Sequence, residues 1–400
     1  MKLENSNISF QNYFLKKKLL SKNYKNFGKR KLKSFKNKIH QKENFFNLFS
    51  KNFKLNKKKF KKFQKFNQIY IIGMGGSILG SEAIYNFLNF KIRKKVEFVN
   101  NLDKSHIKSL KNKISKKTLF ILISKSGNTL ETLSNINFLA KFISEKNSII
   151  ITENSDNPLK NLSRKKNILF IEHKSFIGGR FSVLSEVGIV PSILFNLNIN
   201  NFKKNVQDFF LKKKINYLIE SAKHMSEIYK KKKINSIVFL NYVPELEKFL
   251  SWLQQLLSES LGKKGSGLLP IISSMPKDYH SLLQLYLDGP KDKIFFIFES
   301  KRENISDIKM NLFNKTHGYL NKKNYHQIVD LQKRALVEVF KNKKFQFRNF
   351  IVKKSNEQTL GMLFSYFVLE TILIANFNNI NPYNQPAVEQ VKIKTKNLLK

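Results

Sequence analysis

Three hydroxyl side chains fall within one six-residue stretch, SKSGNT, at residues 124–129. Ser124, Ser126 and Thr129 supply hydroxyl donors, and Gly127 permits a tight turn that gathers backbone N–H groups. The stretch follows an apolar run and opens a helix-like segment, whose first amides add further donors. These features suit the phosphate group of a small molecule. A serine N-cap followed by a turn is the simpler alternative, and it accounts for one hydroxyl rather than three.

A second loop of small residues, GMGGSILG, occupies residues 73–80. Its glycines let a ligand approach the backbone at the end of a strand. A dinucleotide-binding fingerprint that begins at Gly73 requires glycine at position 78, where this chain has Ile78. The lysine of a P-loop is also missing. The loop therefore supports neither NAD nor ATP, and we expect no cofactor.

A carboxylate suited to acid–base chemistry lies in the segment ELEKFLSWLQQLLSESL, residues 245–261. Its leucines at positions 246, 250, 253 and 257 form one apolar stripe of a helix. Gln255 and Glu259 share another face, which fits either solvent or a cleft. A surface carboxylate remains the alternative, because most glutamates are solvated.

From residue 68 onward, short β-branched runs alternate with helix-length segments. The runs are nearly continuous in apolar character, which is typical of a parallel sheet covered on both faces. They occupy residues 69–77, 96–100, 118–124, 148–153 and 167–173, with helices expected at 80–92, 104–114, 129–146 and 157–165. This alternation predicts a doubly wound α/β domain, in which ligands bind beyond the carboxyl ends of the strands.

The same pattern restarts in the second half of the chain, with strands expected at 236–243, 267–273, 293–300 and 345–352. We therefore expect three parts: a basic helical N-terminal segment (1–67), a first domain with linking helices (68–233), and a second domain with a helical C-terminus (234–400). In the first part, the spacing of Phe60, Phe63 and Phe66 predicts one buried helix face. The apolar run at 363–377 is too short to span a bilayer and contains Glu370, so we expect a buried helix.

The chain is strongly basic, with 74 Lys and Arg against 28 Asp and Glu in 400 residues. Such a charge suggests nucleic acid or an anionic membrane as partner. The excess of lysine accompanies heavy use of Asn, Ile and Phe, the other residues of A/T-rich codons, so we favour codon bias and expect no specific nucleic-acid or membrane partner.

Cysteine is absent, the N-terminus lacks the pattern of a secretory signal, and the seven histidines form no convincing metal cluster. We expect a cytoplasmic protein without a metal.

The motifs in their order resemble the sugar isomerase domains of the phosphoglucose isomerase family, in its compact bacterial form. The two loops above are followed by four more segments that match the family pattern: GGRFSVLSEVG (178–188), QQLLSESLGKKG (254–265), HSLLQLYLDGP (280–290) and NPYNQPAVEQVK (381–392). The resemblance covers roughly residues 68–395 and implies two doubly wound parallel-sheet domains.

The resemblance also implies roles for individual residues. Glu259 would be the base that moves the proton, Arg180 would stand near the reacting carbons, and His280 and Lys392 would assist ring opening. The remaining residues would hold the sugar phosphate: Gly76, Ser77, Ser124, the backbone of Lys125, Ser126, Thr129, Gln255 and Gln385. The family pattern further implies a homodimer in which His280 reaches the site of the neighbouring subunit.

The implied reaction is the reversible conversion of D-glucose 6-phosphate to D-fructose 6-phosphate, by ring opening and proton transfer through a cis-enediol. An enzyme that also accepts mannose 6-phosphate and a non-catalytic sugar-phosphate sensor of the same fold remain alternatives. A nucleic-acid-binding protein is a third alternative, motivated by the charge alone.

Overall fold

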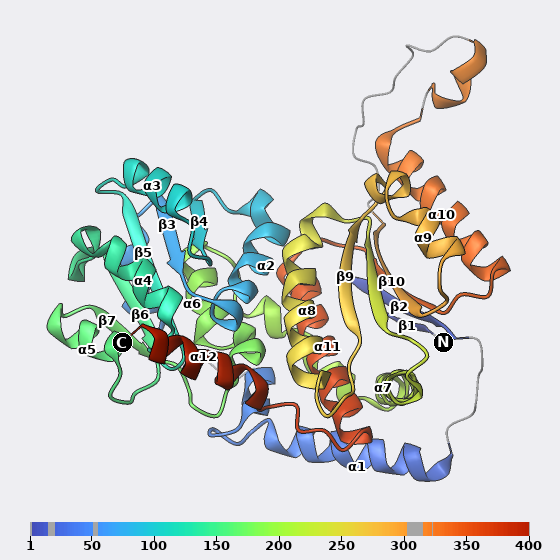
Figure 1. Cartoon of the computed structure of the whole chain (residues 1–400), viewed down its shortest axis with the longest axis horizontal. Coiled ribbons are helices and arrows are strands. Elements are labelled where there is room, and N and C mark those ends of the chain that lie inside the picture. Colours follow the sequence, from blue (N-terminus) through green and yellow to red (C-terminus); the bar gives the residue numbers. More distant parts are fainter. Residues whose placement is uncertain (1, 15–20, 51–54, 302–314, 322, 400) are drawn as a thin grey trace.

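The computed structural model describes residues 2–14, 21–50, 55–301, 315–321 and 323–399. It contains two sheets side by side, each flanked by helices (Figure 1). Helix α2 (Leu79–Leu88) from the first half and α8 (Glu247–Leu261) from the second pack against each other between the sheets. The predicted fold class, an α/β protein with two doubly wound units, is confirmed.

The first sheet has five strands, and all of its neighbouring pairs are parallel. In spatial order they are β4 (Lys95–Val99), β3 (Gln68–Ile72), β5 (Thr118–Ile123), β6 (Ser148–Thr152) and β7 (Leu169–Glu172). Every residue of β5 and β6 is buried, because helices cover both faces, and this explains why these strands read as unbroken apolar runs.

The connecting helices of this half are α2, α3 (Lys104–Lys113), α4 (Leu130–Phe138), α5 (Pro158–Lys165) and α6 (Glu186–Leu194). Helix α4 ends eight residues before the predicted position 146 and gives way to short 3-10 turns. There Asn147 accepts a hydrogen bond from the Ser144 amide and donates one to the Phe142 carbonyl. These side-chain bonds replace the helical ones and close a turn before β6.

The second sheet has six strands in the order β1-β2-β11-β10-β8-β9. Four are parallel and lie in the second half of the chain: β8 (Ser236–Asn241), β9 (Leu269–Ser274), β10 (Lys293–Ser300) and β11 (Phe347–Val352). The helices of this half are α7 (Lys212–Lys231), α8, α9 (Leu283–Asp288), α10 (Tyr325–Asn342), α11 (Glu357–Phe377) and α12 (Pro386–Leu398).

The N-terminal segment is only partly helical, which corrects the prediction for residues 1–67. Strands β1 (Lys2–Glu4) and β2 (Ile8–Tyr13) form an antiparallel hairpin that pairs with β11 and so extends the second sheet. Strand β2 covers the edge of β11, which would otherwise expose unpaired N–H and C=O groups. Helix α1 spans only Lys22–Lys38.

The predicted apolar face of the N-terminal segment is present in a tighter helix. Phe60, Phe63 and Phe66 are all buried, and the first two lie on a 3-10 helix over Lys57–Phe63. A spacing of three residues brings side chains onto one face of a 3-10 helix, which has three residues per turn. The segment packs on the first half, where Gln64 donates a hydrogen bond to the Ile193 carbonyl.

Helix α11 is long enough and apolar enough to cross a membrane by length and composition, but 94% of its most apolar window is buried inside the protein. It is therefore a core helix, as predicted. Its buried Glu370 pairs with Arg348 on β11, which is fully buried and donates to both carboxylate oxygens at 2.9 and 2.8 Å. The other donors of Arg348 reach Asn12 on β2, Ser221 on α7 and Tyr366 on α11. This network joins the N-terminal hairpin to the core of the second half.

Removing one member of the buried pair should therefore destabilise the protein strongly. We expect Arg348→Met to lower the free energy of unfolding by about 3–5 kcal/mol, because Glu370 is left as an uncompensated buried charge. The double variant Arg348→Met with Glu370→Leu should recover most of that loss. Urea unfolding of both variants measures the difference. Arg334→Met serves as control, because Arg334 is exposed in its pair with Asp330 and should change stability by less than about 1 kcal/mol. Equal losses in the single and double variants would contradict this account.

Candidate active site

Two loops meet at the carboxyl edge of the first sheet. The strand order β4-β3-β5 places the change of direction between β3 and β5, and this is where ligands bind in open α/β sheets. The GMGGS loop follows β3 and the SKSGNT loop follows β5. A Cβ atom added to Gly73 would lie 2.9 Å from the Ile123 carbonyl oxygen, so the two loops start in direct contact.

The SKSGNT loop is a compact turn that faces the start of α4. The Ser124 and Thr129 hydroxyl oxygens are 2.9 Å apart, and Ser126 Oγ accepts from the Asn128 amide at 3.3 Å. Gly127 has φ +66°, and a Cβ there would lie 1.8 Å from Asn157 Oδ1, so no larger residue fits. Thr129 makes no side-chain capping bond to α4, which leaves the first amides of this helix available to an anion.

Lys125 contributes its backbone to this edge and turns its side chain away. Its carbonyl accepts from the Glu153 amide at 3.0 Å, and its Nζ donates to the Ser175 carbonyl at 2.8 Å. The role of the Lys125 backbone in ligand binding stays a prediction.

The GMGGS loop packs backbone to backbone against the GGR segment. A Cβ on Gly76 would lie 2.2 Å from the Gly179 carbonyl carbon and 2.5 Å from the Arg180 nitrogen. Ser182 Oγ donates across this contact to the Gly179 and Gly76 carbonyls, at 2.7 and 3.2 Å. Ser77, the next residue of the loop, is buried. The absence of a side chain at Gly76 therefore allows Arg180 to reach the carboxyl edge of the first sheet.

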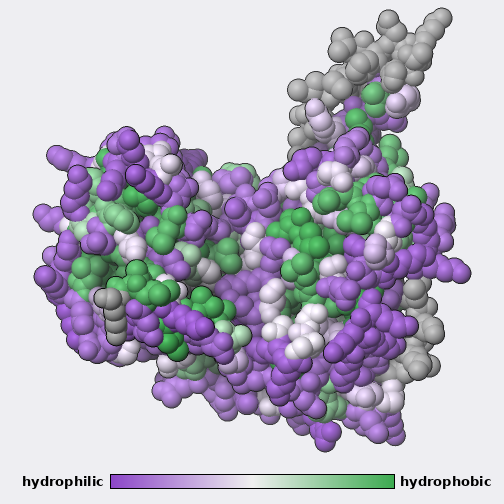
Figure 2. All heavy atoms as spheres, in the orientation of Figure 1, coloured by the Kyte–Doolittle hydropathy of each residue, from purple (hydrophilic) through white to green (hydrophobic). Residues whose placement is uncertain are grey.

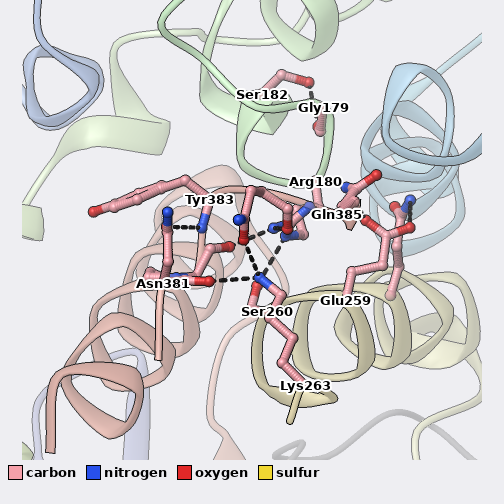
Figure 3. A network of polar contacts seen from close by, with 12 residues as sticks. Gly179, Arg180, Ser182, Glu259, Ser260, Lys263, Asn381, Tyr383 and Gln385 are labelled. Carbon is pink, nitrogen blue, oxygen red and sulfur yellow. Dashed lines mark hydrogen bonds and ion pairs between the residues drawn. The ribbon is translucent and has the colours of Figure 1, made fainter. Parts of the chain in front are cut away.

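The carboxylate of Glu259 is held by one neighbour on α8 and by two side chains from distant parts of the chain, Arg180 and Gln385 (Figure 3). Arg180 Nη1 donates to its Oε2 at 3.0 Å, Gln255 Nε2 to its Oε1 at 2.9 Å, and Gln385 Nε2 to its Oε2 at 2.5 Å. The side chain of Arg180 is completely buried, whereas that of Glu259 is 28% exposed. The carboxylate is thus fixed in orientation but remains accessible.

Arg180 is the centre of the polar cluster drawn in Figure 3. Besides Glu259, it donates from Nε to Ser260 Oγ at 2.9 Å and from Nη2 to the carbonyls of Pro382 and Asn384. Burial lowers the pKa of Arg180, and the charge of Glu259 opposes this shift. Its own carbonyl accepts from the Trp252 indole at 3.1 Å, so both ends of the residue are fixed.

Gln255 joins α8 to the GMGGS loop. Gly75 has φ +52°, and a Cβ there would lie 2.9 Å from Gln255 Nε2. The other amide atom, Gln255 Oε1, is buried without a hydrogen-bond partner. The Gln255 amide therefore lies between the loop and Glu259. Its Oε1 remains free to accept a hydrogen bond, which a substrate hydroxyl would supply.

Sequence reasoning missed the residues that hold the C-terminal loop in place. Lys263, one turn beyond Glu259, donates to the Asn381 carbonyl at 2.5 Å and to Asn384 Oδ1 at 3.1 Å. Burial, followed by the charge of Arg180, lowers the pKa of Lys263 to about 8. Tyr383 packs against the rings of Phe45 and Phe181. The sequence did contain one indication of this role. The loop at residues 381–384 directly precedes Gln385, and Gln385 needs a rigid support in order to reach Glu259.

Two predicted residues are not brought to Glu259. His280 ends the 3-10 turn Lys277–His280 after β9, is exposed, and makes no hydrogen bond or ion pair within the described ranges. Lys392 lies on α12 and pairs with Glu389 at 2.7 Å, with its side chain 65% exposed. Neither has a contact with Arg180, Gln255 or Glu259 in this single chain.

Metal-binding geometry is absent from the described residues, in which no three His, Asp or Glu side chains gather as ligands. The site instead combines a hydroxyl- and amide-lined loop suited to phosphate, an accessible carboxylate suited to proton transfer, and a buried cation beside it. An α/β site with these parts is chemically able to hold an anion and to move a proton beside it.

Comparison with known proteins defines the family. The phosphoglucose isomerase family description matches residues 31–400, so the chain belongs to this family. The glucose-6-phosphate isomerase of Methanocaldococcus jannaschii is 31% identical over 355 residues, 84% of each chain. The glucose-6-phosphate isomerase of Campylobacter jejuni is 31% identical over 349 residues, 83% of this chain and 85% of that one.

Solved structures show the same fold. A glucose-6-phosphate isomerase from Chlamydia trachomatis superposes with a TM-score of 0.78 at 16% identity, covering 100% of this chain and 89% of that one. A hypothetical protein from Thermus thermophilus superposes with a TM-score of 0.82 at 21% identity, covering 94% of each chain. The predicted family and fold are both confirmed.

His173, which directly follows β7, predicts a dependence of stability on pH. It is buried, its amide donates to the Thr152 carbonyl, and burial lowers its pKa to about 4. In the unfolded chain the pKa is about 6.5, so below that pH the unfolded state takes up a proton that the folded state refuses. Stability should therefore fall as the pH falls from about 6.5 towards 4.

We expect His173→Asn to remove this dependence. Between about pH 7.5 and pH 5, the wild type should lose about 2 kcal/mol more unfolding free energy than the variant, measured by urea unfolding at both pH values. Parallel losses in the two proteins would show that His173 titrates normally.

Proposed function

We propose that this chain is a glucose-6-phosphate isomerase that interconverts D-glucose 6-phosphate and D-fructose 6-phosphate in glycolysis and gluconeogenesis. The observation that carries the proposal is the accessible Glu259 carboxylate held by Arg180, Gln255 and Gln385. The donors that hold this carboxylate lie at the switch point of the first sheet, beside the SKSGNT loop. The names of relatives that share about 30% identity over most of the chain agree with this assignment.

The phosphate group binds the SKSGNT loop in this proposal. The hydroxyls of Ser124, Ser126 and Thr129, the Lys125 backbone and the first amides of α4 donate to its oxygens. Gly76 and Ser77 line the sugar side of the site. Because Gly76 touches the GGR backbone, a sugar seated on this loop lies close to Arg180.

Proton transfer follows from the position of Glu259. After ring opening, its carboxylate removes the proton from C2 of the open-chain aldose, while the C1 carbonyl oxygen takes up a proton, giving the cis-enediol. The same carboxyl group returns its proton to C1 as the C2 hydroxyl loses one, and the ketose forms. Arg180 stabilises the negative charge that develops on the substrate oxygens. Gln255 and Gln385 keep the carboxylate facing the two carbons.

Ring opening requires a group that moves a proton near neutral pH, and we assign this step to His280 and Lys392. His280 belongs to the site of the neighbouring subunit in a homodimer. Its exposure in the single chain supports this assignment. Leu269, the first residue of β9, and Leu285 on α9, the helix that follows the turn, are 66% and 49% exposed. Figure 2 shows apolar side chains gathered where β9 lies, as expected of a surface that a second copy covers.

An enzyme of this kind acts in the cytoplasm on small sugar phosphates and needs no cofactor. A sensor of the same fold is the weaker candidate, because binding alone does not require an accessible carboxylate held by three donors. Activity on mannose 6-phosphate as well remains the alternative substrate range, and a coupled assay with each hexose phosphate separates the two.

Replacing the proposed base should abolish chemistry while keeping the site's shape. We expect Glu259→Gln to lose about 100- to 10,000-fold in kcat and to lose exchange of the C2 proton with D2O, measured by NMR, while phosphate binding persists. Glu247→Gln is the matched control, because Glu247 is an exposed glutamate in the first turn of the same helix and should change kcat less than twofold. Retained C2 exchange in Glu259→Gln would place the base elsewhere.

The shared site predicts that two inactive variants restore each other. Glu259→Gln and His280→Ala are purified separately, mixed equally, unfolded and refolded together. Random pairing makes about half of the dimers mixed, each with one intact site of two, so about a quarter of the wild-type activity should return. Each variant refolded alone is the control. Mixed dimers, confirmed by mass, that stay inactive would show that His280 serves its own chain or none.

A further inference from the structure

A second cavity, of about 580 Å³, lies at the carboxyl edge of the second sheet. It is bounded by the residues after β8, the end of β10 and the first turns of α10. Its lining includes Tyr242, Glu299, Ser300, Lys301, His326 and Lys333. The described residues that line this cavity are different from those that surround Glu259. Helix α8 starts beside the cavity and carries Glu259 near its far end, about 18 Å along the helix.

The cavity occupies the place in the second sheet that the phosphate loop occupies in the first. The orders β4-β3-β5-β6 and β9-β8-β10-β11 are the same when the strands of each half are taken in sequence. Strand β10 therefore corresponds to β5, and the switch point lies between β8 and β10. Ser300 and Lys301 stand at the end of β10 as Ser124 and Lys125 stand at the end of β5.

The carboxylates that line the cavity all have partners, Glu245 among them, whereas one lysine of the lining has none in the described part of the chain. Glu299 is buried and already accepts from Asn349 at 2.7 Å and from Lys333. Asp330 is paired with Lys333 at 2.9 Å and with Arg334 at 2.6 Å. By contrast, the side chains of Lys301 and His326 have no hydrogen bond or ion pair in the part of the chain that the structure describes. The ammonium group of Lys301, which has no carboxylate partner among the described residues, favours an anion at the cavity.

Hydrogen-bond donors without acceptors also face this region. Ser300 Oγ is buried without a partner. At the start of α10, the Asn324 cap takes the Gln327 amide, and the first helical bond is that of the Ile328 amide. The amides of Tyr325 and His326 come before the residues that make these two bonds. They are therefore the helix amides that an anion at this N-terminus would contact. A buried hydroxyl without a partner next to free helix amides indicates a missing acceptor.

The wall of the cavity is preformed. Tyr242 and Tyr279 share a hydrogen bond of 2.6 Å between their hydroxyls, and the Tyr279 hydroxyl also donates to the Gln332 carbonyl of α10 at 2.9 Å. These bonds tie Tyr242, which lines the cavity, through Tyr279 to α10, so a ligand meets a wall whose position is already set.

We propose that this cavity binds a small phosphorylated molecule at a second site in each chain. The phosphate contacts Lys301, the Ser300 hydroxyl and the first amides of α10. The volume of the cavity leaves room for an organic part about the size of a hexose. The proposal does not depend on the isomerase assignment, because it rests on residues of the other sheet.

Calorimetric titration at low ionic strength tests the proposal on the full chain. The probes are inorganic phosphate and D-sorbitol 6-phosphate, which has no carbonyl and cannot be isomerised. We expect two sites per chain in the wild type. Lys301→Glu should weaken the second site at least about tenfold, because it replaces an attractive charge by a repulsive one, and should leave the first unchanged. Ser126→Asp should weaken only the first site, at the phosphate loop.

Lys108→Glu on α3 is the matched control, since Lys108 is an exposed lysine far along the first half and its substitution changes the net charge equally. A single site per chain, or equal binding by Lys301→Glu and Lys108→Glu, would overturn the second site. Binding of inorganic phosphate there with exclusion of sorbitol 6-phosphate would overturn the organic ligand. Loss of neither site in Ser126→Asp would instead count against the phosphate loop of the proposed isomerase.

Discussion

The buried guanidinium of Arg180 is the interaction on which the arrangement of the site depends. An arginine that is removed from water must find acceptors for its donors, or the fold pays a large desolvation penalty. Its acceptors come from α8 and from the carbonyls of the C-terminal loop, while its backbone lies against the glycines of the first half. One side chain thereby fixes three segments that are distant in sequence. The position of Glu259 relative to the first sheet follows from that requirement.

Gly76 makes this arrangement sterically possible. A Cβ atom on Gly76 would clash with the backbone of Gly179 and Arg180, whereas a Cβ on Gly179 would lie at an ordinary 3.8 Å from Gly76. The close approach brings Arg180 to the edge of the first sheet at which the SKSGNT loop also lies. Gln255, which reaches Gly75 from α8, closes the contact from the other half. The candidate site is therefore built at the junction of the two sheets rather than within either one.

The two halves repeat one strand order but use it differently. In the first half the switch point carries a loop of small residues with a left-handed glycine, Gly127, and the polar groups that it presents are hydroxyls and amides. In the second half the equivalent point carries charged side chains, and a buried carboxylate, Glu299, already neutralises Lys333. The same backbone topology thus offers two different electrostatic environments. The hairpin β1–β2 adds a further asymmetry, because it pairs with β11, and no described residues form a counterpart on the first sheet.

Local patterns determined much of what could be read from the sequence alone. Strand positions followed from continuous apolar runs, and Gly127 and the hydroxyls around it indicated a phosphate loop, because both signals lie within a few residues. Motif order indicated the family and named Arg180, Glu259 and Gln385. Only the tertiary structure decided that Arg180 is buried, that Lys263 and Tyr383 hold the C-terminal loop, and that residues 8–13 form a strand. The contacts of Arg180 span 79 and 202 residues of sequence, and β2 pairs with β11 across most of the chain. Such partners are chosen by packing and by the need to satisfy buried donors, and a periodicity read over ten residues does not contain that information.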